Sequence, residues 1–388
     1  MQPGALENFF FDDIHFALGA ETLTFAREQC APIRDQFENG SLSEDEAARA
    51  FVKILGAAGL LELCVPEDFG GRHAVLDLRS ICIVREKLSF ESGFADNCFI
   101  LQGLGGNPLA LSGHETLANA WLPRVAKGDA IAAFAVTEPE AGSDLANVKT
   151  TARLENNVYI LNGEKIFISN AGVADFYTVL ARTSDAPGHK GLSMIFVPSA
   201  ADGVRVERQR VIAPHPIGRI HFSSVRVPRE NILTKDGEGL KLALSNLDTF
   251  RTSVGAAACG LAARALADSI AHAKQRIQFG KPLAEQQLTR AALAEMATDL
   301  EAARLLVYRA AAAFDRGSTR ITSAVSMAKM FATEAAQRII DKAVQLHGGL
   351  GVTCGTPVER LYREIRALRI YEGTTEIQKL VIAKGLLK

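Results

Sequence analysis

The chain has 388 residues, of which 48% are hydrophobic and 22% are charged, and its net charge is −1. This composition is typical of an ordinary globular protein, and the length predicts two or three domains. No apolar run approaches the roughly 20 residues that span a bilayer, which argues against a membrane protein. The first residues lack the basic and apolar regions of a secretion signal, so we expect a cytoplasmic location.

Cationic side chains gather in the last third, where residues 251–388 carry 20 Lys and Arg against 12 Asp and Glu. Such a bias suits a nucleic acid or a phosphorylated small molecule, and a biased helix surface explains it equally well. The six cysteines are scattered without C-x-x-C spacing. This pattern indicates free thiols in a reducing compartment, with neither a disulfide framework nor a metal site.

Residues 1–127 are predicted to be helical. Ser43 and Glu46 match a capping box, and apolar residues at helical spacing follow it on one face. Pro66 and the glycines near it predict a break. Apolar helical patterns then resume over residues 76–88 and 108–125.

Residues 128–238 predict a β domain, because short apolar runs alternate with turn residues. A strand over 131–136 ends at Thr137-Glu138-Pro139, and residues 158–169 predict a hairpin that turns at Asn162-Gly163. Further strands are predicted at 176–182, 192–197, 204–211 and 220–227.

Residues 239–388 predict four long helices with short connections, which is typical of an antiparallel bundle. The first should reach about Gln275, the second should end at Gly317, and the third should run over 321–346. The fourth should begin near Thr375, where Thr375 and Gln378 match a capping box.

Four segments place polar groups where the chain turns. Residues 137–144 offer hydroxyls and free N–H groups that suit a ring edge or a phosphate, and residues 167–170 offer an aromatic ring and a hydroxyl. Residues 276–281 place two cations and Phe279 at a helix end, which suits a pyrophosphate. Residues 345–349 contain paired glycines. Taken singly, each segment is also explained as a turn or as cations complementing a helix dipole.

Glu372 lies in the loop before the last helix. Its neighbours Ile370 and Tyr371 are expected to exclude water, and desolvation raises the pKa of a carboxyl group towards that of a general base. The alternative is an acid that complements the dipole of the helix N-terminus.

In this order and spacing, the segments resemble the acyl-CoA dehydrogenase family. The motifs are residues 135–144, Asn162-Gly163-x-Lys165, Arg276-x-x-Phe279-Gly280 and Tyr371-Glu372-Gly373-Thr374, and the resemblance covers essentially the whole chain. It implies an α+β multidomain fold. The domains would be an N-terminal α-helical domain (1–127), a middle β-sheet or barrel-like domain (128–238) and a C-terminal antiparallel four-helix bundle (239–388). It also implies FAD-dependent oxidation of an acyl-CoA thioester to the trans-2-enoyl thioester.

The resemblance implies that Glu372 is the catalytic base and that no metal takes part. The residues that it implies for FAD binding are Phe134, Val136, Thr137, Gly142, Ser143, Phe167, Ile168, Ser169, Arg276, Phe279, Gln287, Gln345, Gly349, Thr374 and Glu376. Those that it implies for substrate binding are Ser143, Asp248, Arg251, Tyr371 and Gly373. In this family Arg276, Phe279 and Gln287 would come from a neighbouring subunit, which implies a homo-oligomer, commonly a tetramer.

Two positions depart from the family pattern. Phe167 stands where many members have tryptophan, and the proline-rich segment 211–220 replaces a glycine-arginine-serine segment beside the acyl cavity. That segment leaves open whether the thioester is on CoA or on a carrier protein. Phe250 occupies the position where some relatives carry the base, and it cannot accept a proton, which again points to Glu372.

We expect an electron-transfer flavoprotein as the electron acceptor. An oxygen-using oxidase and a non-enzymatic, nucleic-acid-associated flavoprotein are the alternatives. The intact Tyr371-Glu372-Gly373-Thr374 motif disfavours flavin monooxygenase-type relatives, which generally lack the base. The chain shows no basic extension after its last helix, so we do not expect nucleic acid as a partner. The lack of an apolar run of bilayer length argues against a membrane as a partner.

Overall fold

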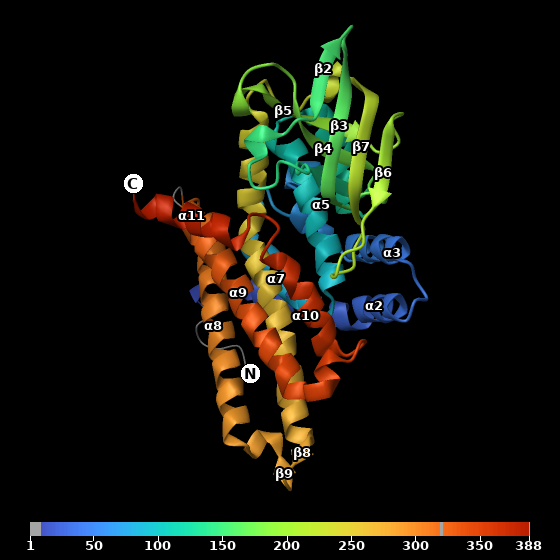
Figure 1. Ribbon diagram of the computed structural model, residues 1–388. Helices are drawn as coiled ribbons and strands as arrows, with labels where there is room; N and C mark the ends of the chain where they lie inside the picture. The colour runs from blue at the N-terminus through green and yellow to red at the C-terminus, as the bar shows by residue number, and fades with distance from the viewer. Residues whose placement is uncertain (1–8, 319–320, 388) are drawn as a thin grey trace. The chain divides into compact units, whose positions relative to one another are not determined.

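The computed structural model describes residues 9–318 and 321–387, which form two compact units (Figure 1). The first unit comprises Met1–Asn39, Leu78–Asp96 and Arg251–Lys388, and the second comprises Gly40–Asp77 and Asn97–Phe250. Each unit is described by itself below.

The first unit is helical. Its helices are α1 (Asp13–Phe25), α2 (Ala31–Glu38), α4 (Leu78–Glu91), α7 (Gly239–Gln275), α8 (Gln287–Asp315), α9 (Thr322–His347), α10 (Pro357–Leu368) and α11 (Thr375–Leu386), with the first turns of α7 in the second unit. A small hairpin of β8 (Ile277–Gln278) and β9 (Lys281–Pro282) joins α7 to α8. Helix α9 packs against α8, α10 and α11. The bounds of α7, α8 and α9 therefore confirm the long helices predicted from the sequence.

Helix α10 was not predicted. Its buried residues Val358, Leu361, Ile365 and Leu368 recur at helical spacing, so it lays one apolar stripe against the bundle. Pro357 stands in its first turn, where the missing N–H costs no hydrogen bond.

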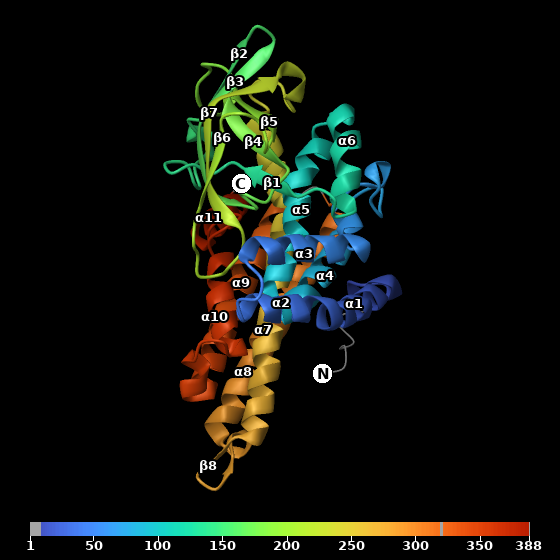
Figure 2. The same ribbon diagram turned by 90° about the vertical axis from the view of Figure 1, so that its right-hand side faces the viewer.

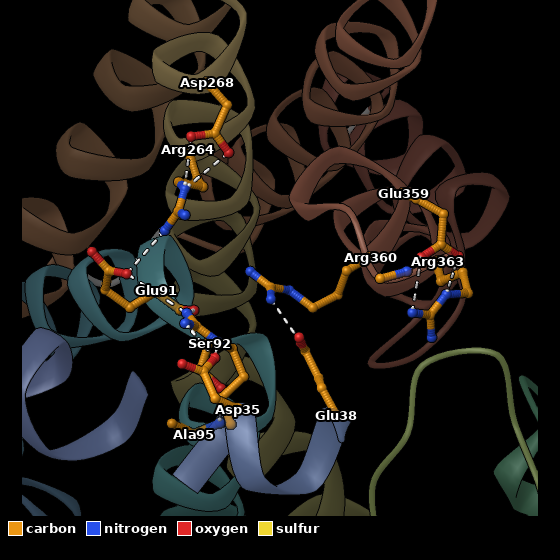
Figure 3. Close-up of polar contacts among 12 residues, drawn as sticks. Asp35, Glu38, Glu91, Ser92, Ala95, Arg264, Asp268, Glu359, Arg360 and Arg363 are labelled. Carbon is orange, nitrogen blue, oxygen red and sulfur yellow. Dashed lines mark hydrogen bonds and ion pairs between the residues drawn. The ribbon is translucent and has the colours of Figure 1, made fainter. Parts of the chain in front are cut away.

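Ion pairs hold the N-terminal helices of this unit to the long ones (Figure 3). The carboxylate of Glu91 lies 2.9 Å from Nη1 of Arg264, which also pairs with Asp268 at 3.0 Å. Glu38 at the end of α2 pairs with Arg360 of α10 at 2.6 Å. The Glu91–Arg264 pair thus joins α4 to α7, and the Glu38–Arg360 pair joins α2 to α10.

The second unit is built on a seven-stranded sheet with the order β1-β4-β2-β3-β7-β6, and β5 pairs with β4. The strands are β1 (Ala132–Ala135), β2 (Thr151–Glu155), β3 (Val158–Ser169), β4 (Phe176–Arg182), β5 (Leu192–Pro198), β6 (Val204–Arg208) and β7 (Ile217–Pro228). Strand β4 is parallel to β1 and β2, and the other pairs are antiparallel. Helices α3 (Glu44–Ala57), α5 (Gly93–Leu111) and α6 (Glu115–Ala126) complete the unit.

The core of this unit lies between the sheet and helices α5 and α6 (Figure 2). Leu109 of α5 and Leu122 of α6 are buried in one apolar cluster with Phe176 and Phe196 of the sheet. The ring of Trp121 lies 5.1 Å from that of Phe176. One face of the sheet is thus covered by helices.

The predicted hairpin turn at Asn162-Gly163 is wrong. Residues 158–169 form one continuous strand, β3, and the turn lies earlier, at Asn156 and Asn157 between β2 and β3. Both asparagines have positive φ, 48° and 68°, as a two-residue hairpin of the primed type requires. Gly163 lies at a bulge of β3, where an added Cβ would stand 2.6 Å from Thr150 Oγ1. The glycine therefore serves close packing and not a turn.

Of two predictions for the N-terminal helices, one is confirmed and one needs adjustment. The capping box is confirmed, because Ser43 Oγ accepts from the Glu46 backbone N–H and Glu46 Oε2 accepts from the Ser43 N–H. The pattern over 108–125 is not one helix, since Pro108 lies inside α5 and α6 begins at Glu115.

Helix α7 is long and apolar enough to cross a membrane by length and composition, contrary to the sequence expectation. However, 67% of that apolar window is buried inside the protein, as in a core helix. Cys30, Cys64, Cys82, Cys98 and Cys259 are buried thiols outside any disulfide, which fits the prediction of thiols rather than a disulfide framework.

Candidate active site

Glu372 lies in the loop between α10 and α11 with a left-handed backbone, at a φ of 52°. Residues other than glycine rarely adopt this conformation, and it costs of order 1–3 kcal/mol unless the surroundings hold it in place. Gly373 follows with a φ of 89°. Backbone strain therefore falls on the residue that the sequence predicts to be the base.

Three side chains hold this loop through its carbonyl groups. Arg251 of α7 donates from Nε to the Glu372 carbonyl at 3.1 Å. Lys329 of α9 donates to the Gly373 carbonyl at 2.8 Å, and Gln378 of α11 donates to the same oxygen at 2.9 Å. Donors from three helices thus fix the backbone of this loop, and none of these bonds uses the Glu372 carboxylate.

The Glu372 carboxylate oxygen Oε2 is buried and makes no hydrogen bond with any residue that the structure describes. Burial raises the pKa of the Glu372 carboxyl, while the charges of Arg85, Arg251 and Lys329 oppose the rise. A buried oxygen without a partner is rare in a folded protein and needs an explanation. A carboxyl group that takes up and releases a proton gives such an explanation.

Ile370 does not exclude water in the way predicted. The side chain of Ile370 is 54% exposed, so it does not desolvate Glu372. Tyr371 is desolvated, and burial raises the pKa of its hydroxyl, which hydrogen-bonds to Arg85. The residues that surround the carboxylate come from other helices.

Arg85 is the largest of these, and its side chain is 1% exposed. Its Nε and Nη2 donate to both carboxylate oxygens of Asp96 at 2.8 and 2.7 Å, and its Nη1 donates to Ser253 Oγ at 3.0 Å. This bidentate pair places a fixed cation near the base. Neither Arg85 nor Lys329 was predicted from the sequence. The available signal was a single charge inside an otherwise apolar helical stripe.

The predicted capping of α11 is displaced by one residue. The N-cap is Thr374, whose hydroxyl accepts from the Ile377 backbone N–H, while the Thr375 hydroxyl donates to Glu334 at 2.7 Å. Gln378 reaches back to loop carbonyls and so acts as a donor rather than as a cap. Thr374, predicted to hold the adenosine end of FAD, therefore has its hydroxyl engaged in the helix cap.

The second unit places the predicted ring-edge residues at the ends of β1 and β3. The carbonyl of Thr137 accepts from the Ile166 N–H at 2.9 Å, which brings the two segments together. Beneath them Lys165, with a fully buried side chain, donates to Glu138 at 2.8 Å and to the Val136 carbonyl at 3.0 Å. This pair was missed in sequence, and it fixes the segment that carries Thr137.

Phe167 stands at a bulge of β3 with a φ of 56°, and its ring is 58% exposed. Ile168 and Val136 are buried, Phe134 is half-buried, and Gly142 and Ser143 are exposed. Two residues after Phe167, the hydroxyl of Ser169 lies 3.2 Å from Nε2 of His215, in the segment that departs from the family pattern. Strand β3 thus presents an exposed ring next to a half-buried hydroxyl.

The residues predicted for the pyrophosphate and adenosine lie at the β8–β9 end of the bundle. Arg276 is exposed, and its guanidinium makes no hydrogen bond or ion pair with any described residue. Phe279 is 94% exposed and has a φ of 53°. Gln345 and Gly349 join them at the end of α9, because the rings of His272 and His347 stack at 4.3 Å. Gln287 is exposed at the start of α8.

The remaining predicted residues are dispersed. Thr374 and Glu376 begin α11, at the other end of α9 from β8 and β9 (Figure 1). Asp248 is half-buried on α7, and Arg251 is buried and holds the Glu372 loop. The described residues contain no group of three or more His, Cys, Asp or Glu side chains placed to hold a metal ion.

Comparison with known families gives matches along nearly the whole chain. The descriptions that match are "Acyl-CoA dehydrogenase, N-terminal domain" over 13–129, "middle domain" over 133–225 and "C-terminal domain" over 237–387. Among curated proteins, the acyl-CoA dehydrogenase of Bacillus subtilis is 39% identical, with 94% of this chain and 95% of that protein covered. The cyclohexane-1-carbonyl-CoA dehydrogenase of Geobacter metallireducens is 37% identical, with 94% of each chain covered.

Solved structures agree. Butyryl-CoA dehydrogenase from Megasphaera elsdenii matches with a TM-score of 0.91 at 32% identity, covering 97% of this chain and 99% of that one. The acyl-CoA dehydrogenase from Bacillus anthracis, complexed with FAD, matches with a TM-score of 0.90 at 33% identity, covering 97% and 67%. A chain from the work on the electron transferring flavoprotein of Acidaminococcus fermentans matches with a TM-score of 0.92 at 33% identity, covering 97% and 99%. The predicted α+β fold, with a helical, a sheet and a second helical domain, is confirmed.

Proposed function

The chain belongs to the acyl-CoA dehydrogenase family, and we propose that it dehydrogenates the Cα–Cβ bond of an acyl-CoA thioester with Glu372 as the α-proton base. The observation that carries the proposal is the buried, unbonded Oε2 of Glu372 on a strained backbone. A carboxyl group with a raised pKa holds a proton taken from a weak carbon acid better than an exposed one does. The predicted domain boundaries, 1–127, 128–238 and 239–388, stay part of the proposal.

The enolate that forms when the α-proton leaves needs hydrogen-bond donors at the thioester oxygen. No described residue accepts a hydrogen bond from the backbone N–H of Glu372, so this donor is available. The bonds from Arg251 and Lys329 to the carbonyls of Glu372 and Gly373 hold the two peptide units that follow this N–H. We assign the Glu372 N–H to the thioester oxygen, with Tyr371 and Gly373 beside the acyl group and Ser143 and Asp248 along the substrate.

The residues present fit FAD, the cofactor of this family. Thr137 and Ser169 offer hydroxyls for a ring edge, Phe167 offers an exposed ring, and the unpaired guanidinium of Arg276 suits a pyrophosphate. Phe279, almost fully exposed, is available to stack on an adenine. When bound, FAD supplies the acceptor for the hydride that leaves Cβ.

The two groups of cofactor residues support a homo-oligomer. Arg276 and Gln345 lie at one end of α9, whereas Thr374 and Glu376 lie at the other. The 26 residues of α9 span about 39 Å at 1.5 Å per residue. Residues so far apart suit the adenosine ends of two different cofactors, so each FAD would be held by two copies of the chain. A tetramer, as in the family, contains such pairs.

We propose a cytoplasmic enzyme that passes its electrons to an electron-transfer flavoprotein. The match to a chain from work on such a flavoprotein supports this acceptor. The acyl group is best sought among short linear and cyclic acids, since butyryl-CoA and cyclohexane-1-carbonyl-CoA dehydrogenases are among the relatives.

The test is anaerobic bleaching of bound flavin by a panel of acyl-CoAs, comparing the wild type with Glu372→Gln. We expect the variant to stay yellow and to bleach about 10²–10⁴-fold more slowly, which is the effect of removing a general base. Glu364→Gln is the matched control, because Glu364 is also a buried acid of raised pKa with an unbonded Oε2. Activity of Glu372→Gln within a few-fold of the wild type would place the base elsewhere.

A further inference from the structure

His215 lies in the proline-rich segment before β7, between Pro214 and Pro216, and its side chain is buried, with the residue 8% exposed. The segment is tied to the end of β3, because the Asn170 N–H donates to the Pro216 carbonyl at 2.7 Å. Ser169 pairs with Ile217 in the same ladder. The imidazole is therefore held against the Ser169 hydroxyl by the backbone on both sides.

The two contacts of the imidazole fix its tautomer. Nδ1 lies 3.0 Å from the Ala213 carbonyl, which only accepts hydrogen bonds, so Nδ1 carries the hydrogen. Burial lowers the pKa of His215, and Arg208 lowers it further, so the ring is neutral at pH 7. Arg208 is in turn paired with Glu44 and Asp45 of α3. In this neutral tautomer Nε2 is an acceptor.

Nε2 lies 3.2 Å from Ser169 Oγ, and the only hydrogen available between the two atoms belongs to serine. The hydroxyl therefore donates inward to His215. Its lone pairs remain for anything that binds at the end of β3. To a ligand, Ser169 is an acceptor and not a donor.

This direction matters for the flavin ring edge that the proposed function assigns to Ser169. We place Ser169 at N5 of that edge, where the oxidised ring has a lone pair and the reduced ring carries an N–H. An acceptor on the protein is matched to the reduced form and mismatched to the oxidised one. We propose that His215 is a positioning residue that turns the Ser169 hydroxyl into an acceptor and thereby favours the reduced cofactor. This inference rests on the proposed function.

The test is the two-electron midpoint potential of bound FAD, measured by spectroelectrochemistry without substrate. In His215→Phe the serine hydrogen is free to turn outward. The ratio of reduced to oxidised FAD at fixed potential should then fall about three- to tenfold, the effect of one hydrogen bond. A tenfold change corresponds to a potential about 30 mV lower. His215→Gln keeps an acceptor at similar reach but loses the lock from Ala213, so its potential should lie between the two.

Two controls separate this role from packing. In a Ser169→Ala background, His215→Phe should leave the potential unchanged, whereas a structural effect would persist. His221→Phe, on β7 and paired with Glu207, should have no effect in either background. An unchanged potential in His215→Phe overturns the inference, as does a shift that survives in Ser169→Ala.

A second measurement does not depend on the variants folding. The ¹⁵N shifts of the His215 ring in the wild-type protein should show a hydrogen on Nδ1, and a hydrogen on Nε2 would overturn the inference. Failure of the proposed function gives a different result. If the proposed function is wrong, the flavin of the wild type is not bleached by any acyl-CoA, whatever midpoint potentials the variants have.

Discussion

Left-handed backbone conformations mark three of the residues assigned to the site. Phe167, Phe279 and Glu372 all have φ between 50° and 60°, and none is glycine, asparagine or aspartate. Such strain is kept only where the surroundings over-determine it. At Glu372 those surroundings are visible, because Arg251 and Lys329 hold the carbonyls of Glu372 and Gly373. No propensity rule predicts this conformation from sequence.

The raised pKa of Glu372 predicts how stability depends on pH. The folded protein binds this proton more tightly than the unfolded chain, so the wild type loses stability as pH rises through the raised pKa. Glu372→Gln should therefore melt at a higher temperature than the wild type at pH 7, and the gap should close as pH falls towards 4.5. Thermal melts from pH 4.5 to 8 measure it.

Glu46→Gln provides a control of opposite sign. Hydrogen bonds from Ser43 lower the pKa of Glu46, so its charged form favours the folded state. That variant should melt below the wild type at pH 7, again with a gap that closes in acid. A Glu372→Gln variant less stable than the wild type at pH 7 would contradict the burial of an ionised base.

At the scale of elements, the segment from β1 to β3 rests on one buried ion pair, Lys165 with Glu138. Lys165→Met would leave a buried carboxylate without its cation, and breaking such a pair costs about 3–5 kcal/mol. Urea unfolding followed by the signal of bound flavin measures the loss. Lys149→Met is the matched control, since Lys149 pairs with Glu140 in the same segment with both side chains 73% exposed, and exposed pairs contribute little. Equal effects in the two variants would contradict this role of burial.

The elements differ in how far the sequence predicted them. The long helices α7 to α9 follow from sustained apolar periodicity, and the strand segments follow from short apolar runs. The hairpin turn was misplaced because Asn-Gly is a pair of residues typical of turns. Glycine is needed at position 163 for another reason, which is that Thr150 packs too closely to leave room for a side chain.

Sequence motifs predicted the side chains that are expected to contact substrate or cofactor, but not the side chains that hold those residues in place. Glu372, Ser169 and Arg276 stand in recognisable runs. The partners Arg85 and Lys329 come from distant helices, and a buried cation on a helix face has no local pattern that names its anion. His215 drew attention only as part of an unusual segment, and its contact with Ser169 depends on strand register.

For the whole molecule, the positions of the cofactor residues at opposite ends of α9 have a genetic consequence. Under the proposed oligomer, a chain with Arg276→Ala keeps its own base but cannot hold its neighbour's FAD, and a chain with Glu372→Gln has the reverse defect. Co-expressed under different affinity tags, the two inactive chains should form hybrids with one intact site per pair. Doubly purified hybrids should therefore regain up to about half of wild-type activity by intersubunit complementation.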